Sequence, residues 1–585
     1  MEETRNCQNC QKDFTIEPDD FGFYERMNVP APTWCPSCRY KRRIIWRNER
    51  HLFKGKESVG GREIFMGISP EAVMPIYELS YWNSDKWDAM DYGIDFDHER
   101  PFFEQIRNLF YQVPYPAKSM QRCVDSDYSN QCDDMKNTYL CFNAVNLEDS
   151  AYCCNAGNSR KCFDMTSCYE DELCYESVRV DKSYRAFGSV MSENCVDVWF
   201  SKNCIGCSNC FGCINQRNSS YKIFNEQYSK EDYFEKIKSL RLDTSRGFLE
   251  AQKNAQEFWR KFPIKFMLGV RNLDVTGEDI KDSKNVKESY IVHGGENLKY
   301  VQDVPFGGAS NSYDYTCWGV NASQLYECMI CGENADNLKF CFDCWPNCQE
   351  LEYCINARRS KNCFACVGVK DKQYCIFNKQ YTKEKYYEIV GTIKKHMDDM
   401  PFTDKLGRVY KYGEFFPSEF SPFAYNETIL DDQFPSTKAG AEGLGFTWRD
   451  SNKKEYETTM IASDMPDSTS DSDVSITKEL IKCADCGKAF RIILDEFNFL
   501  KSQGLPLPRS CSNCRFMARQ KYMAPPVMNE LRCMCNANSE MNSNYENSQS
   551  HESHGMDQCP NTFKTVYNPK ENIVYCESCY QKEVM

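Results

Sequence analysis

The feature that most constrains this 585-residue chain is a short cysteine repeat in its middle. Between Cys123 and Cys213 the repeating cysteines lie 9 or 12 residues apart, with one interval of 21 that equals the two together. They stand at positions 123, 132, 141, 153, 162, 174, 195, 204 and 213. A period this short cannot hold a helical hairpin, but it matches the coil of a small β-solenoid that stacks one residue per coil into an inward ladder. We therefore predict a β-rich chain with a cysteine-lined solenoid.

A second repeat follows at residues 285–378 and uses the same combination of Asn, aromatic residues and Cys. Its end, starting at Asn362, aligns without a gap with the end of the first, starting at Asn209. Ser229 and Thr382 then stand where helix N-caps belong. We expect one helix to close each array and to cover its edge strand. The pattern predicts two solenoids, each with a helical cap.

Two copies of a four-cysteine motif flank the repeats. Each copy reads C-x2-C, then 24 residues, then C-x2-C, and the copies are offset by 476 positions. Paired knuckles suit Zn²⁺, because each knuckle delivers two thiolates to adjacent tetrahedral vertices and four thiolates leave no position open for catalysis. We expect two structural zinc sites in zinc-ribbon or treble-clef domains. Their ligands are Cys7, Cys10, Cys35, Cys38 and Cys483, Cys486, Cys511, Cys514.

The C-terminal stretch predicts a third zinc site, which gives three Zn²⁺ in all. Two strands, Phe563–Tyr567 and Ile573–Tyr575, are expected to form a hairpin that brings a cysteine beside the last knuckle. Three ligands follow: Cys559, Cys576 and Cys579. The fourth is Cys535, Cys533 or His554, and we favour Cys535.

A basic helix is expected after the first zinc site. From Arg39 to Lys56 there are eight basic residues and one acid. Such a helix could lie on nucleic-acid phosphates, or it could pair with the protein's own acidic surface. We favour internal pairing, because the second copy keeps few of these residues and the chain carries a net charge of −14. The nucleic-acid alternative rests on Arg39, Lys41, Arg42, Arg43, Arg47 and Arg50.

The run Cys204-x2-Cys207-x2-Cys210-x2-Cys213 resembles iron–sulfur ligand spacing. The second repeat, however, has Ala357 where Cys204 stands, so we expect thiols and no cluster. The N-terminal MEETRNCQNC has neither the basic nor the apolar region of a signal peptide, and no stretch approaches a membrane span. We expect a cytoplasmic protein with reduced cysteines and no membrane association.

The cysteine groups and the segments between them divide the chain into nine regions. In order these are a zinc-ribbon or treble-clef domain with the basic helix (1–60), an aromatic and acidic linker domain with a helix over 101–112 (61–121), the first cysteine-rich β-solenoid (122–228), a helical cap and connector (229–271), the second solenoid (272–381), a helical cap and aromatic segment (382–450), an acidic linker (451–478), the second zinc-ribbon or treble-clef domain (479–525), and a C-terminal zinc-binding hairpin (526–585).

Several of these motifs carry a resemblance to known families. The segment CADCGKAFRIILDEFNFLKSQGLPLPRSCSNCR and its N-terminal copy resemble a probable zinc-ribbon domain of bacterial proteins. The whole layout, with SYWNSDKWDAMDYG, IFNKQYTKE and IVYCESCYQKEV, resembles a large cysteine-rich family common in candidate-phylum bacteria. The resemblance implies zinc-ribbon domains at both ends and no particular activity. Some similar sequences are labelled CaiB/BaiF CoA transferases, but the α/β units and nucleophilic Asp of that fold are not seen here.

These observations favour a zinc-binding, non-enzymatic scaffold that presents solenoid surfaces to a macromolecular partner, most simply a protein. The alternatives are a thiol-rich metal-handling or redox protein, a nucleic-acid-binding protein acting through the basic helix, and an enzyme such as the labelled CoA transferase. An enzyme is the least favoured of these. The chain has only six His residues and shows no nucleophile–base pair, P-loop or dinucleotide motif.

Overall fold

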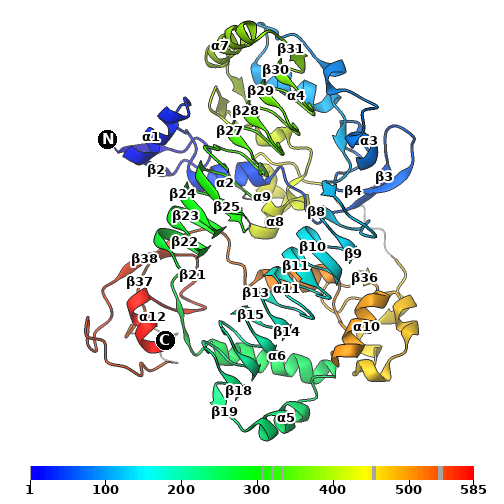
Figure 1. Ribbon diagram of the computed structural model, residues 1–585, viewed down its shortest axis with the longest axis vertical. Coiled ribbons are helices and arrows are strands. Elements are labelled where there is room, and N and C mark those ends of the chain that lie inside the picture. Colours follow the sequence, from blue (N-terminus) through cyan, green and yellow to red (C-terminus); the bar gives the residue numbers. More distant parts are fainter. Residues whose placement is uncertain are drawn as a thin grey trace.

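A parallel β-solenoid runs through the centre of the protein, and the two ends of the chain pack around it (Figure 1). The computed structural model describes residues 2–305, 307–317, 322–332, 334–344, 346–450, 456–537 and 545–584. The β-rich fold and the solenoid predicted from the cysteine repeat are confirmed.

The first run of solenoid strands follows a strict 12-residue register. Phe142 pairs with Cys154, and Thr166 pairs with Val178, both in parallel. The strands of this run are β7 (Met120–Gln121), β8 (Asn130–Asp133), β9 (Lys136–Tyr139), β10 (Phe142–Ala151), β11 (Cys154–Arg160), β12 (Thr166–Tyr169), β13 (Val178–Asp181), β14 (Tyr184–Phe187), β15 (Val190–Glu193), β16 (Val196–Trp199), β17 (Ser208–Phe211), β18 (Ser220–Ile223) and β19 (Glu226–Gln227). One coil therefore takes 12 residues, and the last pair, β18 and β19, closes the run as an antiparallel hairpin.

Each coil has four sides of three residues. Inward-facing side chains recur at every third position, such as Cys141, Leu147 and Cys153, all 0% exposed. The residue before each of these bends the chain with a positive φ, as at Asn146 (51°) and Tyr152 (59°). An L-residue adopts this left-handed conformation at a cost, and Asn tolerates it best, which explains the many Asn residues of the repeat. The cysteine spacings of 9 and 12 correspond to three sides and one full coil, so a coil contributes four inward residues rather than one.

The second run of strands has coils of 11 to 14 residues, and the shortest pairs Gly269 with Ile280. Lys284 pairs with Glu296, but Gly295 pairs with Ala309. The strands are β21 (Gly269–Val270), β22 (Leu273–Lys281), β23 (Lys284–His293), β24 (Gly295–Lys299), β25 (Gln302–Val304), β26 (Ala309–Tyr313), β27 (Asp336–Lys339), β28 (Gln349–Glu352), β29 (Lys361–Phe364), β30 (Gln373–Ile376) and β31 (Lys379–Gln380). The 12-residue register returns between β28 and β29 and continues to β30, beside the closing hairpin.

Helices follow both runs at the positions that the sequence indicates. The Ser229 hydroxyl accepts a hydrogen bond from the Asp232 N–H at the start of α5 (Lys230–Ser239), and Thr382 caps α7 (Lys383–Asp399) in the same way. Helix α6 (Ser245–Trp259) then packs against the first run, where Phe248 contacts Phe200 and Phe258 contacts Phe224. The helix expected over 101–112 is α4 (Phe102–Gln112), with Pro101 as its N-cap residue.

The N-terminal region and the segments around the solenoid complete the fold. Their elements are β1 (Glu3–Asn6), β2 (Asp13–Ile16), α1 (Pro18–Arg26), α2 (Pro36–Ile44), β3 (Phe53–Lys56), β4 (Glu63–Met66), β5 (Ile76–Tyr77), α3 (Leu79–Asn83), β6 (Tyr115–Pro116), β32 (Phe402–Thr403), β33 (Val409–Tyr410), α8 (Ile429–Gln433) and α9 (Lys438–Gly443). Of the expected acidic linker, residues 451–455 lie outside the described residues. In the remainder, Met465 and Ile476 are buried beside α10 (Leu494–Gln503).

The C-terminal region corrects one prediction. Its elements are β34 (Met460–Ile461), β35 (Ile481–Lys482), β36 (Ala489–Phe490), α11 (Ser512–Gln520), β37 (Asn529–Arg532), β38 (Thr562–Thr565), β39 (Ile573–Tyr575) and α12 (Glu577–Val584). The hairpin expected between Phe563–Tyr567 and Ile573–Tyr575 is wrong, because β38 pairs with β37 and β39 pairs with β20 (Pro263–Lys265). Val566 packs against Tyr290 of the solenoid, which draws the chain away from β39.

Candidate metal centres

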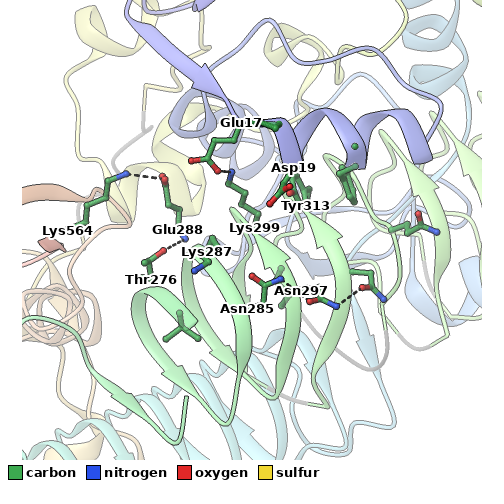
Figure 2. A pocket seen from close by; sticks show the side chains of 18 of the residues that line it. Glu17, Asp19, Thr276, Asn285, Lys287, Glu288, Asn297, Lys299, Tyr313 and Lys564 are labelled. Carbon is green, nitrogen blue, oxygen red and sulfur yellow. Dashed lines mark hydrogen bonds and ion pairs between the residues drawn. The ribbon is translucent and has the colours of Figure 1, made fainter. Parts of the chain in front are cut away.

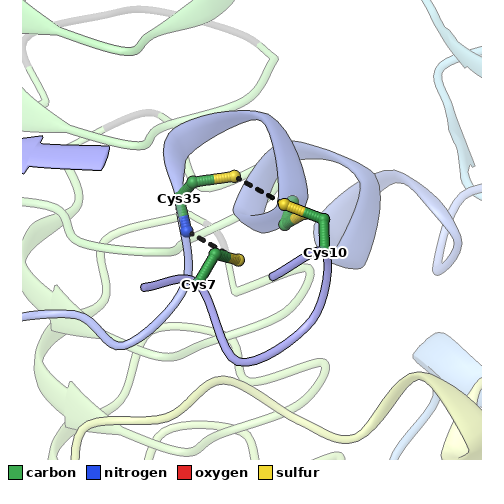
Figure 3. Close-up of side chains that lie close together, drawn as sticks. Cys7, Cys10 and Cys35 are labelled. Atoms are coloured by element: carbon green, nitrogen blue, oxygen red, sulfur yellow. Dashed lines mark hydrogen bonds between the residues drawn. The ribbon is translucent and has the colours of Figure 1, made fainter. Parts of the chain in front are cut away.

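The first four-cysteine group lies where the β1–β2 turn meets the start of α2 (Figure 3). The Sγ atoms of Cys7, Cys10, Cys35 and Cys38 all lie within 4.8 Å of one another. Cys10 Sγ and Cys35 Sγ are 3.8 Å apart. Two thiolates on one tetrahedral Zn²⁺ with bonds of about 2.3 Å would be separated by about 3.8 Å. The cysteine that caps α2 thus brings the second knuckle to metal-binding distance of the first.

The second group repeats this geometry. Cys483 Sγ lies 3.8 Å from Cys514 Sγ, and Cys486 Sγ lies 3.7 Å from Cys511 Sγ. The Cys511 N–H donates to Cys483 Sγ at 3.2 Å, as the Cys35 N–H does to Cys7 Sγ in the first group. Burial raises the pKa of Cys483, but backbone N–H groups of Cys486 and Cys511 outweigh it and lower the pKa to about 7. The local fold thus favours the thiolate, which is the form that binds metal.

The third group contains Cys533 in the place expected for Cys535. The sulfur atoms of Cys533, Cys559, Cys576 and Cys579 form one set, and Cys559 Sγ lies 3.9 Å from Cys576 Sγ. Cys533 continues alongside the partner strand, since its N–H donates to the Asn561 carbonyl at 2.8 Å. The chain then turns, so Cys535 falls in an adjoining group, which consists of Cys535, His551, His554 and Cys579.

The described residues therefore hold four groups that could each bind a metal ion, where the sequence led us to expect three. Sequence reasoning considered His554 only as an alternative ligand and did not use His551. A signal for both was present, since the two histidines are spaced as H-x2-H downstream of a C-x-C motif. None of the four groups includes a solenoid cysteine. All 36 cysteines are free thiols.

The arginines of the basic helix are buried against the solenoid. Arg39, Arg42 and Arg43 are at most 1% exposed. Arg39 and Arg43 bind the same carboxylate, that of Asp314, at 2.8 Å and 3.1 Å. Arg42 lies between two further carboxylates, those of Glu327 and Glu414. Arg47 is buried too and pairs with Glu49, so these four guanidinium groups face acids of this chain.

The second module docks in the same way on the other run of strands. Arg519 Nη1 lies 2.7 Å from Asp164, and its Nε donates to Thr166 Oγ1 at 3.1 Å. Arg43, its counterpart 476 positions earlier, binds Asp314 and donates to Thr316 Oγ1 at 3.0 Å. The N-terminal module thus sits on the second run of strands and the C-terminal copy on the first (Figure 1).

Aromatic rings repeat this correspondence between the two interfaces. Phe23 of α1 stacks on Tyr313 with ring centroids 3.9 Å apart. Phe499 of α10, again 476 positions later, stacks on Phe163 at 4.5 Å. The duplicated sequence therefore produces a duplicated interface, in which a four-cysteine module is fixed to a solenoid coil by charge pairs and stacked rings.

The fold and the cysteine groups define a β-solenoid protein with candidate metal centres. A scan against models of known protein families gave no match, and no curated protein matched the chain. None of the helices in the described ranges is long and apolar enough to cross a membrane.

Proposed function

We propose that the protein is a zinc-stabilised, non-enzymatic scaffold whose solenoid surface binds a protein partner. The observation that carries this proposal is the docking of both four-cysteine modules through buried Arg–Asp pairs. Each helix that starts at a metal knuckle, α2 or α11, also supplies the arginines that hold the solenoid. Metal binding at the knuckle would therefore fix the helix that clamps the coil.

Zinc is the metal that the ligand sets support best. The sulfur separations of 3.7 to 3.9 Å fit tetrahedral coordination by thiolates. Four protein ligands per group leave no coordination position for a substrate, which favours a structural role. In each module the first C-x2-C knuckle lies in a turn and the second lies at the start of a helix, α2 or α11. This order supports the zinc-ribbon or treble-clef assignment. The proposal includes a cytoplasmic location, because a reducing compartment keeps cysteines available as metal ligands.

A groove of about 1180 Å³ offers a binding surface (Figure 2). It lies between α1, the strands β22, β23, β24 and β26, and β38. Asn285 donates to Asn297 at 2.9 Å, and Asn297 donates to Asn311 at 3.0 Å, which forms a ladder of amides along one wall. Such a ladder offers the donors and acceptors that an extended peptide backbone needs.

The charges of the groove favour a peptide over a nucleic acid. Lys299 is paired with Glu17 and Asp20 at 2.6 Å and 2.7 Å, and Lys564 is paired with Glu288 at 3.1 Å. Paired lysines do not create the positive field that attracts phosphates. The four buried arginines, Arg39, Arg42, Arg43 and Arg47, also face the interior of the protein and are not accessible to phosphates. A protein partner is therefore the occupant that we propose.

The test places a photocrosslinking amino acid at Asn297, within the groove, in the full-length protein expressed in its native host. The matched control places it at Asn158, an exposed residue of the first run whose amide accepts from Asn146 at 3.0 Å. We expect a protease-sensitive adduct of defined mass at Asn297 and none at Asn158. A nuclease-sensitive adduct at Asn297, or equal labelling at both positions, would overturn the proposal.

A second candidate function is thiol-based metal handling. One solenoid coil is lined by four cysteine side chains, each 0% exposed: Cys204, Cys207, Cys210 and Cys213. Hydrogen bonds between these thiols raise the pKa of Cys204 and lower the pKa of Cys207, so the coil contains one thiol that ionises more readily than its neighbour. Uptake of Cu⁺ by this coil, lost in Cys207→Ala, would favour this second function over the scaffold.

A further inference from the structure

The C-terminal module places two candidate metal groups side by side, and Cys579 belongs to both. We infer that this module binds two zinc ions bridged by the Cys579 thiolate. One ion would be held by Cys533, Cys559, Cys576 and Cys579, and the other by Cys535, His551, His554 and Cys579. This inference is independent of the proposed scaffold function.

The distances in the histidine-containing group fit a tetrahedral ion. His554 Nε2 lies 3.4 Å from Cys579 Sγ and 3.5 Å from Cys535 Sγ. A thiolate and an imidazole nitrogen on one tetrahedral Zn²⁺ would lie about 3.6 Å apart. His551 Nδ1 lies 3.9 Å from Cys535 Sγ, and the two imidazole rings stack with centroids 4.8 Å apart. The four ligand atoms thus surround a space of the right size.

Each histidine has its second ring nitrogen held by an oxygen acceptor. His551 Nε2 lies 2.9 Å from Glu583 Oε1, which leaves Nδ1 for the metal. His554 Nδ1 lies 2.7 Å from the Asp557 carbonyl oxygen, which leaves Nε2 for the metal. Metal-bound histidines nearly always donate their other N–H to a carboxylate or carbonyl in this way, because it fixes the ring and its tautomer.

Helix α12 organises the two groups from one face. Cys579 and Glu583 are four residues apart on α12, so both side chains project from the same side of the helix. Glu583 is fixed in turn, since its carboxylate accepts from the Ser548 and Gln549 N–H groups at 2.7 Å and 3.1 Å. One helix therefore supplies the bridging thiolate and the carboxylate that orients His551.

Charge also favours two ions over one. A single Zn²⁺ with four thiolates carries a charge of −2, and Cys535 would add another buried thiolate beside it. Two Zn²⁺ ions shared among the five thiolates and two neutral imidazoles carry a net charge of −1. Since all five cysteines are at most 5% exposed, the smaller net charge lowers the cost of burial.

The test is metal counting by native mass spectrometry of the full-length protein purified in zinc-containing medium. We expect four zinc ions in the parent, three in Cys535→Ala, and two in Cys579→Ala. His396→Gln, which changes a histidine outside every candidate group, should retain four. Replacement by ¹¹³Cd should give a scalar coupling between two cadmium nuclei of the C-terminal module, lost in Cys535→Ala.

Two results would overturn the inference. Three zinc ions in both the parent and Cys535→Ala would show that the histidine-containing group binds no ion. A loss of only one ion in Cys579→Ala, together with no cadmium coupling, would show that the two ions share no ligand. Neither result depends on what the groove binds, so the crosslinking test of the scaffold stands apart.

Discussion

Replacing Asp314 by asparagine should destabilise the N-terminal module by about 3 to 5 kcal/mol. Asp314 is fully buried, and its two carboxylate oxygens bind Arg39 at 2.8 Å and Arg43 at 3.1 Å. Asparagine keeps the shape but removes the charge, which leaves two desolvated guanidinium groups facing one amide. At about 1.4 kcal/mol per factor of ten, amide protection in α2 should fall by about 10² to 10⁴-fold. Hydrogen exchange of the full-length protein measures this opening directly.

The matched control is Asp371→Asn. Asp371 also binds an arginine, with Arg359 at 2.8 Å, but the two side chains are 51% and 62% exposed. An exposed pair contributes at most about 1 kcal/mol, so protection near β30 should change by less than about tenfold. If Asp314→Asn lowers protection no more than Asp371→Asn does, the buried pair is not the clamp. The triple variant Asp314→Leu, Arg39→Met, Arg43→Met should restore much of the protection, because it leaves no unpaired charge in the buried site.

Three further predictions concern the interior and the metals. Burial raises the pKa of Asp171 well above its usual range, so the folded protein retains the proton of this carboxyl group. Folding stability is therefore lost as the pH rises above about 3.9, the pKa of an Asp in the unfolded chain. Asp171→Asn should raise the melting temperature more at about pH 8 than at about pH 5. Cys153→Ala should cost about 1 to 2 kcal/mol of unfolding free energy by urea titration and leave the zinc count unchanged, whereas loss of one ion would make it a ligand. Chelation of zinc should abolish hydrogen-exchange protection in α2 and α11, and unchanged protection in both would refute the metal dependence of the clamp.

Local spacing was sufficient to predict the solenoid and the two repeated cysteine groups. A C-x2-C knuckle brings its two sulfurs together by itself, and the repetition at 476 positions marks both copies as one motif. The sequence also contains a signal for the three-residue side of the coil, but the signal is the spacing of Asn residues and not that of Cys residues. The Asn residues at the corners, such as Asn143 and Asn146, mark the left-handed positions, and the cysteines mark only some of the inward ones.

Contacts between distant segments could not be predicted from spacing. Asp314 lies 275 residues from Arg39, and nothing in its neighbourhood distinguishes it from a surface acid. The same limit explains the hairpin error at the C-terminus. Asn568-Pro569 is a strong local turn signal, but Ile573–Tyr575 pairs with β20, more than 300 residues earlier, where it is buried. Local turn chemistry fixes a bend, while the available apolar surface decides which strand pairs with which.

The crossed docking of the modules makes the ends of the chain dependent on each other's repeat. The module at residues 7–38 clamps coils near Asp314, and the module at 483–514 clamps coils near Asp164. Each interface therefore closes a loop of roughly 270 to 360 residues, whose entropy must be offset by buried pairs and stacked rings. A fragment that ends between the two runs would contain the N-terminal module and the first run of coils, which are not partners in the intact protein. The two four-cysteine modules and the solenoid should therefore unfold as one cooperative unit, and Asp314→Asn should weaken both the N-terminal module and the distant coil that it contacts.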